Sequence, residues 1–267
     1  MKMGQTEVTL KAELPGVADG DHLFLDRSLK ESIRLEDDEV HVWLATLQSP
    51  SSVILDLWRT LAPDEKQRAL KFHFQRECDR FIVARGLLRS ILGSYLSQAP
   101  EQIRFAYNEF GKPALRNVLG ESSLEFNLSH ADNRAIFAVA RQRRVGIDIE
   151  RMRADLANDT VAKHFFSARE QEDLSTLGPE EWQRGFFTCW TRKEAFVKAQ
   201  GEGLSIPLNE FDVSLLPAEA AALLKVRSGG TNSSDWSLHE LPVGSDYVAA
   251  LAVEGHNWQL HCWKPSS

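Results

Sequence analysis

The 267-residue sequence predicts an α+β fold built from two similar halves. The order of a strand, apolar helical segments and several short strands occurs twice, on either side of residues 141–144. Apolar and polar residues alternate in Val145–Ile149, as in a half-buried strand, whereas residues 182–197 carry an apolar stripe with helical spacing. We therefore expect an unassigned N-terminal arm at 1–38, a first α+β half at 39–142 and a second α+β half at 143–267.

The first half opens with an apolar strand at residues 40–47, after an arm that mixes charged residues with turn formers. Apolar helical patterns follow at 53–61 and 63–96. Short apolar runs then predict strands at 103–105, 124–128 and 135–140.

The second half repeats that order. Its opening strand directs Val145, Ile147 and Ile149 to one face and Asp148 and Glu150 to the other. Helical segments lie between residues 161 and 199, where the apolar stripe consists of Trp182, Phe186, Cys189, Trp190 and Val197. Further strands are expected at 211–215, 237–241, 247–253 and 259–263.

Composition excludes several classes of protein. A net charge of −7 argues against nonspecific nucleic-acid binding, which needs a basic surface. The sequence lacks the run of roughly 18 apolar residues that spans a membrane, and its N-terminus lacks an apolar signal core. Three scattered cysteines indicate neither a disulfide framework nor a zinc motif. We expect a soluble, cytoplasmic protein that binds neither nucleic acid nor membranes.

Two segments offer groups for metal and phosphate chemistry, although each has a simpler explanation. Side chains two apart on one strand face lie roughly 6.5 to 7 Å apart, so Asp148 and Glu150 can share one hard cation. The same alternation is also typical of a strand with a solvated polar face. Glu194 and Lys198 stand one helical turn apart, which suits a metal ligand beside a phosphate contact but is also the spacing of an exposed surface pair.

Six motif segments in order decide between these interpretations. The strand Gly146–Glu150 and the helix Trp190–Lys198 resemble the G-I-D-I-E and W-S/T-x-K-E-A/S-x-x-K signature of the 4'-phosphopantetheinyl transferase superfamily, in its larger, Sfp-type branch. The remaining segments of the chain that resemble this family are Phe110–Pro113, Phe126–His130, Phe165–Glu170 and Gly201–Ser205. The resemblance extends from about Val40 to about Val253.

The resemblance implies a pseudo-dimeric fold within one chain, a monomer with coenzyme A in the cleft between the halves. It implies Mg²⁺ on Asp148, Glu150 and Glu194, and catalysis by Glu194 as base and Lys198 as the group that stabilises the leaving group, with Glu170 or a metal-bound water as the other candidate bases. The implied coenzyme-binding residues are Arg80, Lys112, Pro113, Asn127, Ser129, His130 and Lys198. From the residues alone, Gly111–Pro113 is equally an exposed turn and Asn127–His130 a strand end that caps backbone groups.

The expected function is Mg²⁺-dependent transfer of 4'-phosphopantetheine from coenzyme A to a serine hydroxyl of an apo acyl or peptidyl carrier protein, with release of 3',5'-ADP. The carrier can belong to fatty-acid, polyketide, nonribosomal-peptide or lysine biosynthesis, and the sequence does not distinguish these. One alternative is another metal-dependent phosphotransferase acting on a nucleotide, which the lack of a G-x-x-x-x-G-K-S/T loop disfavours. The other is a noncatalytic protein that binds coenzyme A or a carrier.

Overall fold

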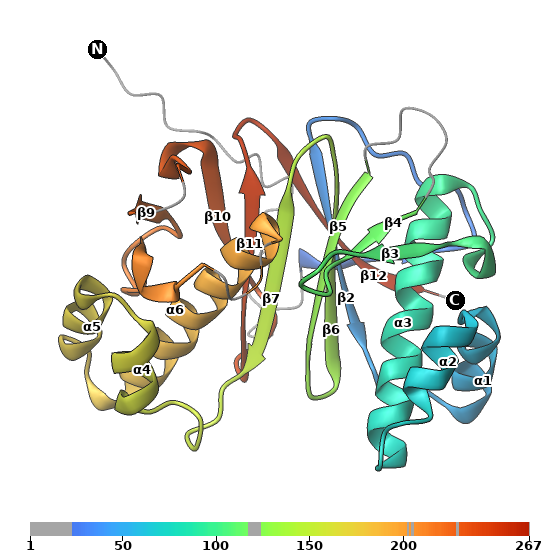
Figure 1. Cartoon of the computed structure of the whole chain (residues 1–267), viewed down its shortest axis with the longest axis horizontal. Coiled ribbons are helices and arrows are strands. Elements are labelled where there is room, and N and C mark those ends of the chain that lie inside the picture. Colours follow the sequence, from blue (N-terminus) through green and yellow to red (C-terminus); the bar gives the residue numbers. More distant parts are fainter. Residues whose placement is uncertain (1–22, 117–123, 202, 204–205, 228–229, 267) are drawn as a thin grey trace.

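Two β-sheets pack face to face, and helices cover their outer faces (Figure 1). The computed structural model describes residues 23–116, 124–201, 203, 206–227 and 230–266. Apolar side chains between the sheets form one core, a second core lies under the long helix of the first half, and a third lies under the long helix of the second half. This mixed architecture confirms the predicted α+β class.

The first half contains the helices that lie on the right in Figure 1. Its strands and helices are β1 (Leu25–Ser28), β2 (Glu39–Thr46), α1 (Ser51–Thr60), α2 (Pro63–Ala69), α3 (Gln75–Leu96), the 3₁₀ turn η2 (Pro100–Gln102), β3 (Phe105–Tyr107), β4 (Pro113–Leu115), β5 (Leu124–Ala131) and β6 (Arg134–Arg141). The single helical pattern expected at 63–96 is two helices, because residues 70–74 leave the helical conformation between α2 and α3.

The second half begins with the acidic strand. Its elements are β7 (Val145–Arg151), α4 (Asp159–Phe165), α5 (Ala168–Ser175), α6 (Pro179–Gln200), the 3₁₀ turn η4 (Leu208–Glu210), β8 (Phe211–Val213), β9 (Leu223–Val226), the 3₁₀ turn η5 (Ser233–Asp235), β10 (Trp236–Leu241), β11 (Tyr247–Glu254) and β12 (Gln259–Ser266). Pro179 opens α6 and Gly201, at φ +81°, ends it, which follows the usual asymmetry of helix termini.

One strand, β12, follows the smaller sheet's strands in the sequence but lies in the larger sheet. The larger sheet has the order β1-β12-β2-β6-β5, and the smaller has β10-β11-β7. Strand β12 follows the second half in sequence, yet it pairs in parallel with β2, with His261 opposite His41. A chain division after residue 142 therefore separates β12 from the sheet that it completes, because β12 pairs with β1 and β2 of the first half.

The segment expected to be an unassigned arm is in part structured. Within it, β1 pairs in parallel with β12, and Phe24, Ile33 and Leu35 are buried in apolar cores. Residues 23–38 therefore contribute to the larger sheet and its cores, because these apolar side chains pack against it. Residues 1–22 lie outside the described part of the chain.

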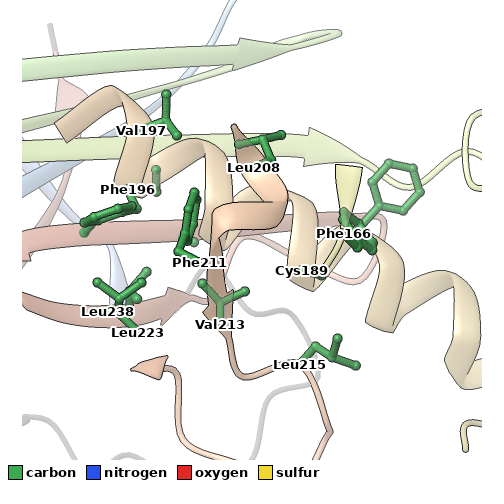
Figure 2. Packing of buried hydrophobic residues seen from close by; sticks show 14 of the residues in the cluster. Phe166, Cys189, Phe196, Val197, Leu208, Phe211, Val213, Leu215, Leu223 and Leu238 are labelled. Carbon is green, nitrogen blue, oxygen red and sulfur yellow. The ribbon is translucent and has the colours of Figure 1, made fainter. Parts of the chain in front are cut away.

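Helix α6 crosses the outer face of the smaller sheet and buries its apolar stripe. Figure 2 shows Phe196 of this helix against Phe211 and near Leu238, with Cys189 farther along the helix. The predicted stripe is confirmed, with Phe186, Cys189 and Val197 buried and the two tryptophans of the stripe packed at the margin of the core.

Gly146 lets α6 lie directly on β7. A Cβ atom at this position would overlap the carbonyl oxygen of Ala195 and the amide nitrogen of Ala199, and would lie 2.8 Å from Ala199 Cα. The backbone of the strand and that of the helix therefore touch, which only glycine permits. This contact fixes the distance between the carboxylates of β7 and the functional side chains of α6.

Candidate active site

Asp148 and Lys198 meet where β7 and the last turn of α6 cross. The apolar residues of β7 point into the core between the sheets, so Asp148 points to the opposite face, which α6 covers. Lys198 Nζ donates to Asp148 Oδ1 at 2.6 Å and to Ser129 Oγ of β5 at 3.0 Å, and Ser129 Oγ donates to Asp148 Oδ1 at 2.8 Å. Three sequence-predicted residues are thus in direct contact.

The carboxylates of Glu150 and Glu194 lie close enough to Asp148 for the negative charges to repel one another. The nearby cations do not fully offset this repulsion. Burial and the neighbouring charges of Asp148 and Glu194 raise the pKa of Glu150 to about 7, although the Lys198 ammonium opposes the shift. Burial and Asp148 likewise raise the pKa of Glu194 against Lys198. This excess of carboxylates favours a bound cation, because a cation would stabilise all three in the charged form.

The donor set fits a magnesium ion that keeps part of its water shell. Asp148 is 2% exposed, and its Oδ2 has no hydrogen-bond partner among the described residues. The oxygens of Asp148, Glu150 and Glu194 do not all lie within 4.8 Å of one another among those residues. In this arrangement waters and substrate phosphates would have to complete an octahedral shell, as is common for Mg²⁺.

A pocket of about 290 Å³ opens beside this cluster, and both halves line it. The first half contributes Phe110, Lys112, Pro113 and Asn127, whereas Glu194, Lys198 and Gly201 come from the end of α6 and the turn after it. Five of the predicted site residues thus line one pocket, and it lies at the predicted boundary of the halves.

Lys112 holds the C-terminus of α6. Its ammonium donates to the carbonyl oxygens of Lys198 at 2.7 Å and Ala199 at 3.2 Å, and burial lowers its pKa. A cation at this end of a helix is favourable, because the last carbonyls lack partners within the helix. Lys112 therefore has a structural role as well as a place in the pocket wall.

Asn108 supports the same contact, and sequence reasoning did not select it. Its Nδ2 donates to the carbonyl oxygen of Gly201, at the C-cap of α6, at 2.7 Å. Its Oδ1 accepts from the backbone nitrogens of Phe110 and Lys112, which shapes the turn at Gly111. An asparagine three residues before a glycine is a common turn signal, so the sequence contained a usable indication.

Asn127 joins the two sheets. It is 5% exposed, and its Oδ1 accepts from the backbone nitrogen of Ile147 at 3.0 Å, which links β5 to β7. Asn127, an expected coenzyme contact, therefore also aligns the two strands that bear Ser129 and Asp148. Pro113, the first residue of β4, lies in the pocket wall.

His130 stands among several cations. Its ring keeps an exposed edge, but loss of surrounding water, followed by the Lys198 ammonium, lowers its pKa, and Arg80 and Arg68 act in the same direction. Arg80 is held in place by Asn133 Oδ1, which accepts from its Nε at 3.1 Å, and by an ion pair with Glu77 at 3.0 Å. The positive potential here is suited to an anion.

Other charged residues near the motifs are structural. Glu170 is fully buried in an ion pair with Lys193 at 2.8 Å and accepts from the backbone nitrogens of Ser167 and Val213. It has no exposed atom that could reach a substrate, which favours Glu194 over Glu170 as the base. Arg85 and Arg89, the neighbours of Arg80 on α3, are buried and pair with buried Glu65.

Comparison with known families and relatives agrees with the motifs. The model of the 4'-phosphopantetheinyl transferase superfamily matches residues 144–252, and that of the 4'-phosphopantetheinyl transferase N-terminal region matches residues 48–142. The 4'-phosphopantetheinyl transferase HetI of Nostoc sp. is 43% identical over 87% of this chain and 94% of its own length. The 4'-phosphopantetheinyl transferase Sfp of Bacillus subtilis is 32% identical over 58% of this chain and 66% of its own.

Among solved structures, the Thermotoga maritima holo-[acyl-carrier-protein] synthase aligns with 42% of this chain and 63% of its own, at a TM-score of 0.33 and 17% identity. The extent and identity of the match to HetI, together with family models that cover both halves, establish the relationship. The chain belongs to the 4'-phosphopantetheinyl transferase superfamily, as a transferase of the Sfp type.

Proposed function

We propose that the enzyme transfers 4'-phosphopantetheine from coenzyme A to a serine hydroxyl of an apo acyl or peptidyl carrier protein in a Mg²⁺-dependent reaction that releases 3',5'-ADP. The observation that carries this proposal is the contact of Asp148 with Lys198 and Ser129, beside a pocket that both halves line. A noncatalytic binding protein would have no need for a buried carboxylate oxygen without a partner, because such an atom destabilises the fold.

Asp148, Glu150 and Glu194 would hold the metal. A bound Mg²⁺ would supply charge neutralisation to the pyrophosphate oxygens of coenzyme A. The hard oxygen donors of these three side chains suit Mg²⁺ better than a softer metal.

Glu194 is the proposed base. The serine hydroxyl of the carrier must lose its proton as its oxygen attacks the phosphorus that bears pantetheine, and a carboxylate with a raised pKa accepts that proton more readily. The new bond joins serine oxygen to phosphorus, and the bond to the departing 3',5'-ADP breaks. After the reaction the phosphopantetheine group is on the serine oxygen, 3',5'-ADP has left, and the serine proton is on Glu194.

Lys198 stabilises the negative charge that develops on 3',5'-ADP. Its hydrogen bonds to described residues use two of its three N–H groups, which leaves one for a phosphate oxygen. Arg80, Lys112 and His130 are proposed to contact the coenzyme phosphates, and the positive potential around His130 supports this. Ser129 is proposed as a further hydrogen-bond donor, and Asn127 and Pro113 as part of the pocket wall.

The direct test is the mass of the carrier. Incubation of the enzyme with apo carrier protein, coenzyme A and Mg²⁺ should add one phosphopantetheine to the carrier, as read by intact-protein mass spectrometry. Glu194→Gln should lower kcat on the order of 10²-fold or more, the usual contribution of a general base, while coenzyme A still binds. Glu181→Gln, on the first turn of the same helix, is the matched control and should leave kcat unchanged. Lack of the mass increase with several carrier types would exclude this function.

Mg²⁺ affinity should depend on pH near neutrality. Glu150 has a pKa of about 7, so its side chain is largely neutral below that pH and is a poor metal ligand there. The Kd for Mg²⁺, measured by calorimetry between pH 5.5 and pH 8 or so, should rise by up to about tenfold per unit as the pH falls below 7. Glu150→Gln should flatten this dependence, whereas Glu254→Gln, a surface carboxylate paired with Arg144, should retain it. An equally steep dependence in Glu150→Gln would assign the titration to another group.

We further propose that the enzyme acts as a monomer in the cytoplasm, without binding nucleic acid or membranes. One chain supplies both walls of the pocket, so a second subunit is not needed to complete it. Cys78, Cys189 and Cys262 are free thiols, which is usual in a reducing compartment. Within the described ranges, none of the helices combines the length and apolar character needed to cross a bilayer.

A further inference from the structure

A second group of metal-ligating side chains lies on the larger sheet, outside the proposed active site. Glu39 and His41 belong to β2, and His261 belongs to β12. Glu39 and His41 are two residues apart and therefore share a face, and the strand register places His261 directly beside His41. One donor atom from each of the three side chains lies within 4.8 Å of the others, the only such group among the described residues.

The distances in this group match the edges of a tetrahedral ligand shell. His41 Nε2 lies 3.3 Å from Glu39 Oε2, and His261 Nε2 lies 3.5 Å from Glu39 Oε1. Ligands placed about 2.0–2.2 Å from a tetrahedral zinc ion are separated from one another by roughly 3.3–3.5 Å. Both separations are longer than the usual N–H···O hydrogen bond, and Glu39 Oε2 also accepts from the backbone nitrogen of Glu36 at 3.0 Å.

Two ring nitrogens in this group are placed to bind a metal ion. His261 Nε2 is buried and has no hydrogen-bond partner among the described residues. Behind His41, the Tyr95 hydroxyl lies 2.7 Å from Nδ1 and also accepts from Trp43 Nε1 at 2.9 Å. A hydrogen bond at one ring nitrogen fixes the orientation of a histidine and directs the other nitrogen at a metal, as seen around ligating histidines in general.

The surroundings favour a borderline metal over magnesium. Two imidazoles with one carboxylate are ligands of the type that Zn²⁺ prefers, whereas Mg²⁺ prefers oxygen donors. Burial lowers the pKa of His41 to about 3, so its ring is neutral, as a ligand must be. Arg27, whose guanidinium stacks on Trp263 at 4.4 Å, places a positive charge nearby and should weaken binding relative to a thiolate site.

We propose that Glu39, His41 and His261 form a Zn²⁺ site that joins β12 to β2. The His261 side chain is 35% exposed and that of Glu39 is 21% exposed, so two of the three ligands lie partly at the surface. Because the ligands come from strands at the two ends of the described chain, bound zinc would stabilise the insertion of β12 into the larger sheet. This role is independent of the proposed transfer reaction.

Zinc titration of metal-free enzyme tests the proposal. The experiment uses Asp148→Ala protein in excess Mg²⁺, so that the carboxylates of the active site do not take up zinc. We expect one equivalent of Zn²⁺ by calorimetry, a rise in Tm on zinc addition, and the visible absorption of tetrahedral Co²⁺ when cobalt replaces zinc. His261→Gln should weaken Zn²⁺ binding at least about 100-fold, more than the loss of an outer-shell partner usually costs.

Three further variants make the result specific. Glu39→Gln removes a second ligand from a partly exposed position and should also abolish the zinc-dependent rise in Tm. His73→Gln and Cys78→Ser, which change side chains of types that can bind metals but that lie outside the cluster, should bind zinc like the parent protein. The Tm of each metal-free variant shows that it is folded. Undiminished binding in both His261→Gln and Glu39→Gln, or no zinc uptake by the parent protein, would overturn the proposal.

Discussion

Replacing Asp148 with alanine is expected to lower kcat for pantetheinyl transfer by on the order of 10³-fold, because the enzyme loses a metal ligand and an electrostatic contact in one step. Asp148 Oδ1 accepts from both Lys198 and Ser129, so both side chains lose their common acceptor as well. Removal of the Asp148 charge should also lower the pKa of Glu150, since that charge helps to raise it. Single-turnover loading of apo carrier, followed by mass spectrometry, measures the rate.

The matched control for this change is Asp132→Asn. Asp132 lies in the turn between β5 and β6 and pairs with Arg151 at the surface. Asparagine tolerates its positive φ of 47°, so the turn is retained while the charge is lost. This variant should keep kcat within about twofold, in line with the small contribution of a surface ion pair. A kcat for Asp148→Ala close to that of Asp132→Asn would exclude Asp148 from the reaction.

Gly146→Ala is expected to lower the free energy of unfolding by about 3 kcal/mol, at the upper end of the usual cost of overpacking. The added methyl group would meet backbone atoms of Ala195 and Ala199, which cannot turn aside as a side chain can. Strand β7 and helix α6 must then separate, and Asp148 moves away from Lys198. Urea unfolding monitored by circular dichroism should give a lower midpoint, and kcat should fall in the protein that remains folded.

Gly178→Ala provides the comparison for this stability effect. Gly178 is the N-cap of the same helix, its φ is −66°, and a Cβ there would have no atom within 4 Å. The change should cost less than about 1 kcal/mol, mainly through the weaker capping preference of alanine. Equal unfolding midpoints for the two variants would mean that the approach of α6 to β7 does not depend on glycine.

The elements with a clear period were predicted well from the sequence. In β7, alternation correctly separated the core face from the carboxylate face, although the polar face is covered by α6 and not by solvent. Short elements without such a pattern, β1, β4 and β9, were missed. Their four or fewer residues carry too little periodicity, and their pairing depends on partners distant in sequence.

The candidate site was predictable as a set of residues but not as a set of contacts. Ordered motifs located Asp148, Ser129 and Lys198, which the structure brings together. No local pattern indicates that Lys112 caps α6 or that Asn127 binds the backbone of β7, since both contacts join residues far apart in the sequence. Burial likewise separates Glu170 from Glu194, two glutamates whose local sequences alone leave both open as bases.

The position of β12 constrains how this chain folds during synthesis. Strand β2 is synthesised early, but one of its two partners in the larger sheet, β12, is synthesised only after the rest of the second half. Until then, β2 exposes an unpaired edge, and β1 has no strand to join. Such an edge invites pairing with other chains, so the interval before β12 arrives is when the nascent protein most needs protection by a chaperone.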